Sequence, residues 1–184
     1  IGLIRIFIDQ GHNPTNPNSG AEANGLREQD INYVVGKELE ALLKANGNFA
    51  VQVSRPTPET HLGSKDATSS RASLQARVQA ANQWPADYFI SLHCNTNPNP
   101  NISGSEAYVY SRSSEAYPLA EHILIGLAQV TGLPNRGVKI STSLYVLRRT
   151  TMPAVLVEMG FLTNVEDAAL LESRPDLFAQ GIYQ

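Results

Sequence analysis

Residues 4–12 read IRIFIDQGH, an apolar run of strand length that ends in a histidine. The pattern returns in residues 88–93, YFISLH, where a second apolar run ends in a histidine, and in residues 154–158, AVLVE, which end in a glutamate. In open α/β sheets, ligands bind in the crevice beyond the carboxyl ends of parallel strands. Two imidazoles and a carboxylate at such strand ends therefore predict a metal site at one edge of a sheet.

The composition places limits on the class of protein. A length of 184 residues suffices for one domain with a substantial core, and 42% hydrophobic with 17% charged residues is typical of globular domains. The net charge of −3 and the lack of a Lys/Arg run argue against a nucleic-acid partner. No apolar run approaches the ~20 residues that span a membrane. Cys94 is the single cysteine, so no intrachain disulfide can form.

Apolar residues elsewhere alternate between strand-like and helical spacing. We expect strands at residues 4–9, 49–53, 86–92, 105–110, 144–147 and 154–157, and helices at residues 27–45, 71–84, 116–131, 165–172 and 175–184. This order predicts βαβ units. We expect one α/β domain over residues 1–184, with a mainly parallel twisted sheet of about six strands and helices on both faces.

His12 and His93 each follow a strand-like run, and either one alone would most often be a surface or structural residue. Their shared placement favours a metal site, and Glu28, in the first turn of the next helix, is a third candidate ligand. Its alternative role is to complement the helix dipole, worth about 0.3–1 kcal/mol. Two histidines and a glutamate, with water in the fourth position, form a known catalytic zinc set. Glu158 is then placed to act as a general base, or alternatively to form a helix cap or a salt bridge.

The remaining histidines and the cysteine are weaker candidates. We expect His61, in a polar loop, and His122, on a helix flank, to be solvated. Cys94 follows a candidate ligand directly, so strand alternation points it to the opposite face as a small buried residue. The HExxH, GxSxG and P-loop motifs are absent from the sequence.

Three further polar residues could support chemistry at the strand ends. Asp9 could hydrogen-bond a ligand histidine, or it could cap the following loop. Arg148 could contact an anionic substrate, although an exposed arginine at a strand end is usually only solvated. Arg148 and Asn95 are therefore candidate substrate-binding residues.

Taken in chain order, these segments resemble a known family. The segments are DQGH at residues 9–12, Glu28, SLHCN at residues 91–95 and EMGFLTN at residues 158–164. Together they resemble the zinc-dependent N-acetylmuramoyl-L-alanine amidases, specifically the type 3 catalytic domains of bacterial cell-wall amidases. The resemblance covers nearly the whole chain. The family usually has proline at the position of Gln10 and alanine at that of Cys94.

The resemblance implies a role for each matched residue. His12, Glu28 and His93 would hold one Zn²⁺ ion, and Glu158 would be the catalytic glutamate. Zinc-bound water, deprotonated by Glu158, would attack the lactyl carbonyl of N-acetylmuramic acid. The protonated glutamate would then release the amine of L-alanine, so that the stem peptide is hydrolysed from the glycan.

The resemblance also implies partners and a location. The partner would be peptidoglycan, and the protein would be a secreted bacterial autolysin acting at the cell wall. Some relatives carry an inhibitory helical insertion after the strand at residues 105–110, but only residues 111–115 separate this strand from the next helix here. We therefore expect no inhibitory insertion, an open site and a monomer. The ends of the chain suggest a mature or excised catalytic domain.

Two other functions stay open at this point. The chain could be a zinc amidase or peptidase acting on another peptide-like bond, because the metal chemistry would be the same. It could also be a non-catalytic module that binds peptidoglycan. The presence of all four residues of the expected site argues against the second reading.

Overall fold

The computed structural model describes residues 2–184 and has a central six-stranded sheet in the order β4-β1-β5-β8-β6-β7. The strands are β1 (Ile4–Gln10), β2 (Glu22–Ala23), β3 (Leu26–Arg27), β4 (Phe49–Val53), β5 (Tyr88–Asn95), β6 (Ser105–Val109), β7 (Asn135–Ile140) and β8 (Ala154–Phe161). The helices are α1 (Glu28–Asn46), α2 (Arg71–Gln83), α3 (Ala116–Thr131), α4 (Tyr145–Arg149), α5 (Val165–Ser173) and α6 (Pro175–Tyr183). None of the described helices is long and apolar enough to cross a membrane.

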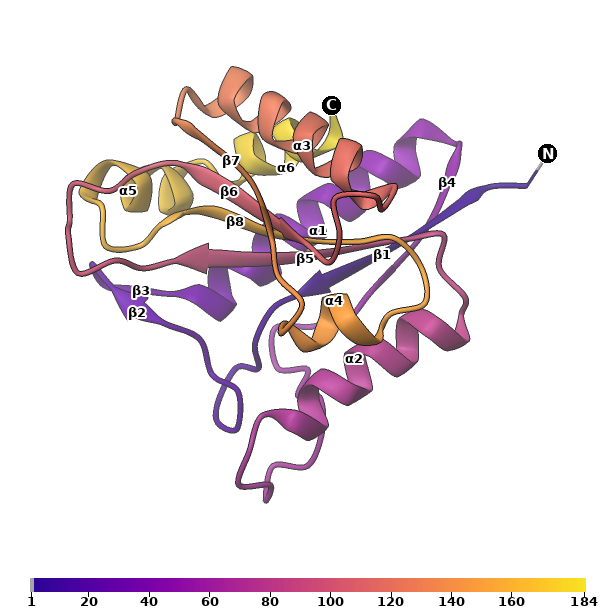
Figure 1. Ribbon diagram of the computed structural model, residues 1–184. Helices are drawn as coiled ribbons and strands as arrows, with labels where there is room; N and C mark the ends of the chain where they lie inside the picture. The colour runs from indigo at the N-terminus through magenta and orange to yellow at the C-terminus, as the bar shows by residue number, and fades with distance from the viewer. Residues whose placement is uncertain (1) are drawn as a thin grey trace.

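The sheet is mainly parallel, as predicted. Within this sheet, β1 runs parallel to β4 and β5, β5 runs parallel to β8, β6 runs parallel to β7, and β6 and β8 are antiparallel. Strands β2 and β3 form a separate antiparallel pair. Helices cover both faces, with α1, α3 and α6 on one side and α2 and α4 on the other (Figure 1). The predicted α/β domain is confirmed.

The two faces have separate cores because successive strand residues point to opposite sides. Ile8 and Leu92 pack with the helices of the α1 face, whereas Phe7 and Phe89 stack under α2 and α4 with ring centroids 5.7 Å apart. Burying a side chain of this size is worth about 1.5–3 kcal/mol. Both cores fix β1 and β5, the strands that lead to the two candidate histidines.

Helix α1 has an apolar stripe at helical spacing, formed by Ile31, Val35, Leu39 and Leu43, which are all buried. It ends at Gly47, whose φ of 83° lies in the left-handed region and whose N–H donates to the Lys44 carbonyl. Because the stripe fixes the rotation of the helix, Glu28 in its first turn faces the ends of β1 and β5.

The strand predicted at residues 144–147 is wrong, because this run leads into helix α4. A short apolar run cannot be assigned by periodicity alone. Val146 and Leu147 are buried in the core below α2, and Arg148 is exposed in the last turn. The sixth strand is instead β7, a polar edge strand interrupted by Gly137, which has no strand-like alternation in the sequence.

Candidate metal centre

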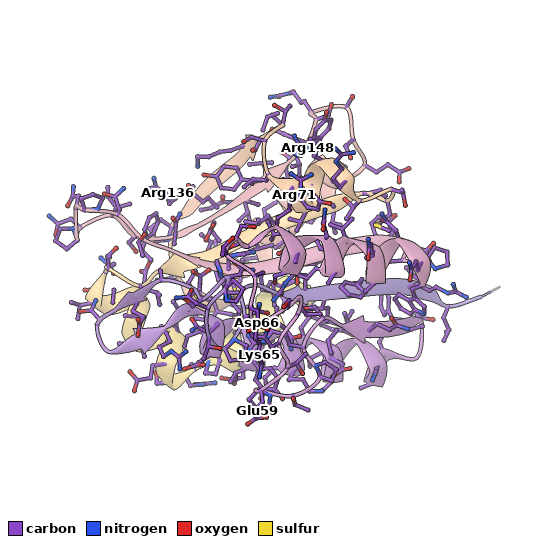
Figure 2. The ribbon with its side chains drawn as sticks, turned by 90° about the horizontal axis from the view of Figure 1, so that it is seen from below. Glu59, Lys65, Asp66, Arg71, Arg136 and Arg148 are labelled. Atoms are coloured by element: carbon purple, nitrogen blue, oxygen red, sulfur yellow. The ribbon has the colours of Figure 1, made fainter. Side chains whose placement is uncertain are left out.

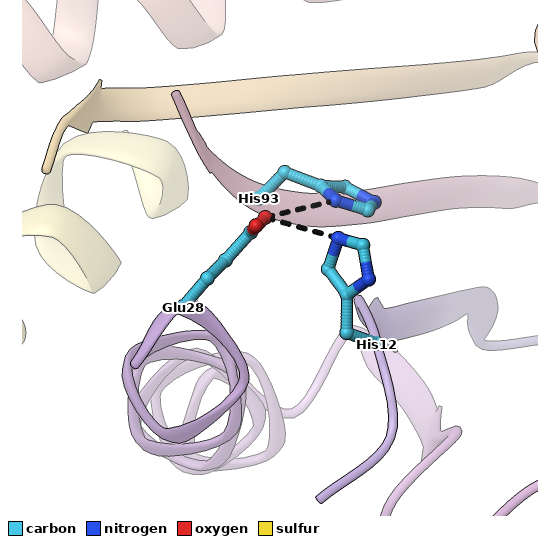
Figure 3. Close-up of side chains that lie close together, drawn as sticks. All are labelled: His12, Glu28 and His93. Carbon is cyan, nitrogen blue, oxygen red and sulfur yellow. Dashed lines mark hydrogen bonds and ion pairs between the residues drawn. The ribbon is translucent and has the colours of Figure 1, made fainter. Parts of the chain in front are cut away.

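The structure brings His12, Glu28 and His93 together at the carboxyl ends of β1 and β5 (Figure 3). One ligand atom from each residue lies within 4.8 Å of the others. Glu28 Oε2 lies 3.3 Å from His12 Nε2 and 3.2 Å from His93 Nδ1. The three residues come from a loop, a helix and a strand, so only the folded chain can assemble this cluster.

The second nitrogen of each histidine has its own partner. His12 Nδ1 lies 3.0 Å from Asn18 Oδ1, and His93 Nε2 lies 2.9 Å from Ser91 Oγ. In a neutral imidazole with its N–H at this position, the other nitrogen is unprotonated and can bind a metal ion. In a protonated imidazole, the other nitrogen donates to Glu28 instead. Partners of this kind orient the histidines of metal sites.

Asp9 acts on this site through a neighbour rather than directly. The Ser91 hydroxyl donates to Asp9 Oδ2 at 2.7 Å, so Asp9 reaches His93 only through Ser91. The direct hydrogen bond expected as one possibility for Asp9 is therefore wrong. The reason is geometric, because Asp9 and Ser91 are adjacent in the β1–β5 register and share one face of the sheet.

Arg77 of α2 supports the loop that carries His12, and the sequence analysis missed it. It is buried, and its guanidinium donates to Asp9 Oδ1 at 2.7 Å, to the Gln10 carbonyl at 2.6 Å and to the His12 carbonyl at 2.8 Å. It thereby holds the loop in which His12 adopts a left-handed φ of 69°. Its place three residues after Leu74, on the inward side of α2, was the available signal.

Gly11 allows the two histidines to approach each other. A Cβ atom at this position would lie 2.4 Å from His93 Cε1 and 2.7 Å from the Leu92 carbonyl oxygen. Both contacts are far inside van der Waals distance. Any larger residue at position 11 would therefore displace either the strand end or the His93 ring.

The charges of the cluster are strongly coupled. Burial alone would raise the pKa of Glu28, but hydrogen bonds and charge interactions with His12 and His93 hold it well below its usual range. Burial would lower the pKa of His93, but Glu28 outweighs this effect and raises it. The carboxylate is therefore ionised, and the site attracts a positive charge.

Glu158 of β8 lies opposite His93 in the β5–β8 register. Its Oε2 atom is buried and has no hydrogen-bond partner within residues 2–184. Burial, with added repulsion from the charges of Glu28 and Glu106, raises its pKa to about 7, although His93 opposes the shift. A carboxylate with this pKa can take up and release a proton near neutral pH.

The structure places the two candidate substrate residues differently. Asn95 donates to Glu106 Oε1 at 2.6 Å and accepts from the Thr96 N–H at 3.0 Å, so its side chain is engaged within the protein. Arg148 is exposed on helix α4 (Figure 2) rather than at a strand end. Neither residue joins the His–Glu–His cluster.

The weaker candidates also have clear positions. His122 is exposed and Cys94 is buried, as predicted. The prediction that His61 is solvated is wrong, because both ring nitrogens are buried without a partner in the described part of the chain. The polar sequence around His61 gave no sign that its loop folds over the ring.

An α/β domain with a His–Glu–His cluster beside an unpartnered carboxylate has the make-up of a metal-dependent hydrolase. Residues 6–184 match the family model described as N-acetylmuramoyl-L-alanine amidase, and the chain belongs to this family. It is 37% identical over 182 residues to the N-acetylmuramoyl-L-alanine amidase LytC of Bacillus subtilis, with 97% of this chain and 34% of that protein covered. It is 35% identical over 182 residues to CwlM of Bacillus licheniformis, with 98% and 64% covered.

The chain thus spans between about a third and two thirds of the length of these curated relatives. Among solved structures, it is similar to the catalytic domain of the amidase CwlV from Bacillus (Paenibacillus) polymyxa var. colistinus. The TM-score is 0.83 at 31% identity, with 98% of this chain and 94% of that chain covered. An N-acetylmuramoyl-L-alanine amidase from Clostridium difficile 630 gives a TM-score of 0.86 at 28% identity, with 100% and 95% covered.

Proposed function

We propose that residues 1–184 form the catalytic domain of a zinc-dependent peptidoglycan hydrolase. It cleaves the amide between the lactyl group of N-acetylmuramic acid and the L-alanine of the stem peptide. The observation that carries this proposal is the His12–Glu28–His93 cluster next to the unpartnered carboxylate of Glu158. Membership of the amidase family and the printed names of the relatives support the choice of bond.

The donor set fits zinc. Ligand atoms about 2.0–2.1 Å from a tetrahedral zinc ion lie about 3.3 Å from one another. Glu28 Oε2 lies 3.3 Å and 3.2 Å from the two histidine nitrogens, which matches this separation, and all three ligand atoms lie within 4.8 Å of one another. Two imidazoles and a single carboxylate leave the fourth position for water or substrate.

The proposed reaction needs a metal ion and a group that transfers a proton, and Glu158 is that group. When bound, zinc supplies Lewis acidity, which lowers the pKa of water and polarises a carbonyl. Glu158 accepts a proton from the attacking water as the new C–O bond forms at the lactyl carbonyl. It then donates this proton to the amine of L-alanine as the C–N bond breaks. Its pKa of about 7 suits both steps at neutral pH.

We further propose that the protein acts as a monomer on peptidoglycan at the bacterial cell wall. The connection between β6 and α3 consists of residues 110–115, which is too short for an inhibitory helix. An open site should be active without an activating partner. A large stimulation of the isolated domain by another protein would contradict this part of the proposal.

Digestion of purified peptidoglycan tests the proposed reaction. The digestion is run with enzyme alone, with a chelator, and with zinc added back, and the new chain ends are identified. We expect new L-alanine N-termini that disappear with the chelator and return with zinc. New reducing sugar ends, or a cut inside the stem peptide, would overturn the assignment of the bond.

A further inference from the structure

A second polar cluster lies beside Glu158 and is not used by the proposed mechanism. It consists of Glu106, Arg136 and Lys139, and is called the Glu106 cluster below. Glu106 lies directly opposite Glu158 in the antiparallel β6–β8 pair. Side chains of such pairs share one face, with Cβ atoms about 4.5–5.5 Å apart. The cluster therefore begins one side chain away from the proposed base.

The cluster carries more positive than negative charge. Glu106 is 5% exposed, and both of its oxygens are occupied. Oε1 accepts from Asn95, whereas Oε2 accepts from Lys139 Nζ at 2.5 Å and from Arg136 Nε at 3.3 Å. Two cations thus share one carboxylate, and a second anion would balance the charge.

Arg136 is held ready to bind that anion. Its guanidinium carbon lies 5.2 Å from the centroid of the Phe161 ring, and its Nε is fixed by Glu106. The two Nη groups donate no hydrogen bond within the described residues, and 34% of the side chain is exposed. A planar guanidinium with both terminal nitrogens free matches the two oxygens of a carboxylate.

The cluster lies on the face of the sheet that carries α2 and α4. Ala107 and Val109 of β6 pack in the core with α3, so Glu106, which alternates with them, points to the opposite face. Glu158 shares that face. In Figure 2, which looks onto the side of α2 and α4, Arg136 lies beside the strands and away from α2. A peptide leaving the metal centre across β8 would meet Arg136 on β7.

We propose that Arg136, assisted by Lys139, binds a free carboxylate on the second residue of the stem peptide. The inference rests on the proposed function, since it assumes that the amine released beside Glu158 begins a peptide. One residue of extended chain spans about 3.3–3.6 Å. The side chains of Arg136 and Lys139 extend from β7 back to Glu106 on β6. One residue of chain and these side chains together span the gap from the cleaved amide to the Glu106 cluster. Stems with this carboxylate converted to an amide should be poorer substrates.

Two synthetic muramoyl peptides test the proposal. They differ only in whether the carboxylate of the second residue is free or amidated. We expect wild-type kcat/KM to be about tenfold higher for the free acid, which is the size of one hydrogen bond to a charged group. Arg136→Ala should abolish this preference through KM, with kcat and zinc content unchanged, and Arg136→Lys should retain part of it.

Arg112→Ala is the matched control, because Arg112 also stacks on an aromatic ring, at 5.0 Å from that of Tyr117, but lies outside the cluster. It should leave the preference intact. Equal losses of kcat/KM on both peptides in Arg136→Ala, or no preference in the wild type, would overturn the proposal.

A binding experiment distinguishes a failure of this proposal from a failure of the proposed function. The zinc-loaded protein is titrated with the two free stem peptides, one with the free carboxylate and one with the amide. If the free acid binds more tightly through Arg136 but the muramoyl peptides are not cleaved, only the proposed amidase reaction is overturned.

Discussion

The two flanks of the metal centre are built in opposite ways. On the β1–β5 flank, both carboxylate oxygens of Asp9 are hydrogen-bonded, as are the hydroxyl of Ser91 and all three nitrogens of the Arg77 guanidinium. On the β8–β6 flank, Glu158 has a buried oxygen without a partner among residues 2–184. Leaving such a group unpaired costs about 1–3 kcal/mol. Under the proposed function, the first flank would hold the zinc ligands in place, whereas the second would keep a carboxylate free to react.

The largest effect should come from removing the free carboxylate. Glu158→Gln keeps the shape of the side chain but cannot accept the proton of the attacking water. We expect amidase activity to fall about 10²–10⁴-fold, the usual contribution of a general base. Zinc content, measured by atomic absorption, should stay near one ion per chain. Activity close to wild type would show that the proton is handled by another group.

The β1–β5 flank should respond in stability instead. Arg77→Met leaves the buried Asp9 carboxylate without its counter-charge, which typically costs about 3–5 kcal/mol. Urea unfolding measures the loss. Arg71→Met, on the exposed side of the same helix (Figure 2), is the control and should stay within about 0.5 kcal/mol of wild type. Similar losses in the two variants would mean that Arg77 has no special role.

A smaller effect, on zinc affinity, is expected from a change at Gly11, which lies next to His93. Gly11→Ala places a methyl group against the His93 ring and the Leu92 carbonyl, so either the ring or the strand end must shift. We expect zinc affinity to fall about 10–100-fold, as for other disturbances of ligand orientation. Competition with a fluorescent chelator measures it. Gly2→Ala, which has nothing within 4 Å of the added Cβ, should bind zinc as the wild type does.

The same contrast explains what the sequence could predict. The strand runs before His12, His93 and Glu158 are apolar and bounded, so their places at one sheet edge followed from α/β topology. Arg77 was missed because a helical arginine is usually solvated. Its place three residues after Leu74 indicates the inward side of the helix, but its buried contacts arise only in three dimensions. β7, which carries Arg136, escaped notice because an edge strand needs no apolar alternation. Local patterns therefore predicted the centre, whereas its supports depend on tertiary contacts.

The last prediction concerns how the stability of the metal-free protein depends on pH. Burial raises the pKa of Glu158 from 4.5 to about 7, so the folded state retains a proton that the unfolded state has lost in this window. Folding stability must then decline as the pH rises from about 4.5 to 7. His93, whose pKa is raised from 6.5, adds to the decline only above about pH 6.5, whereas Asp9 and Glu28, with lowered pKa values, contribute only at more acidic pH. Urea unfolding of chelator-treated protein at pH 5 and pH 7 should show a weaker decline in Glu158→Gln than in wild type. Parallel curves for the two proteins would mean that Glu158 is ionised throughout, and that the β8–β6 flank is as well paired as the β1–β5 flank.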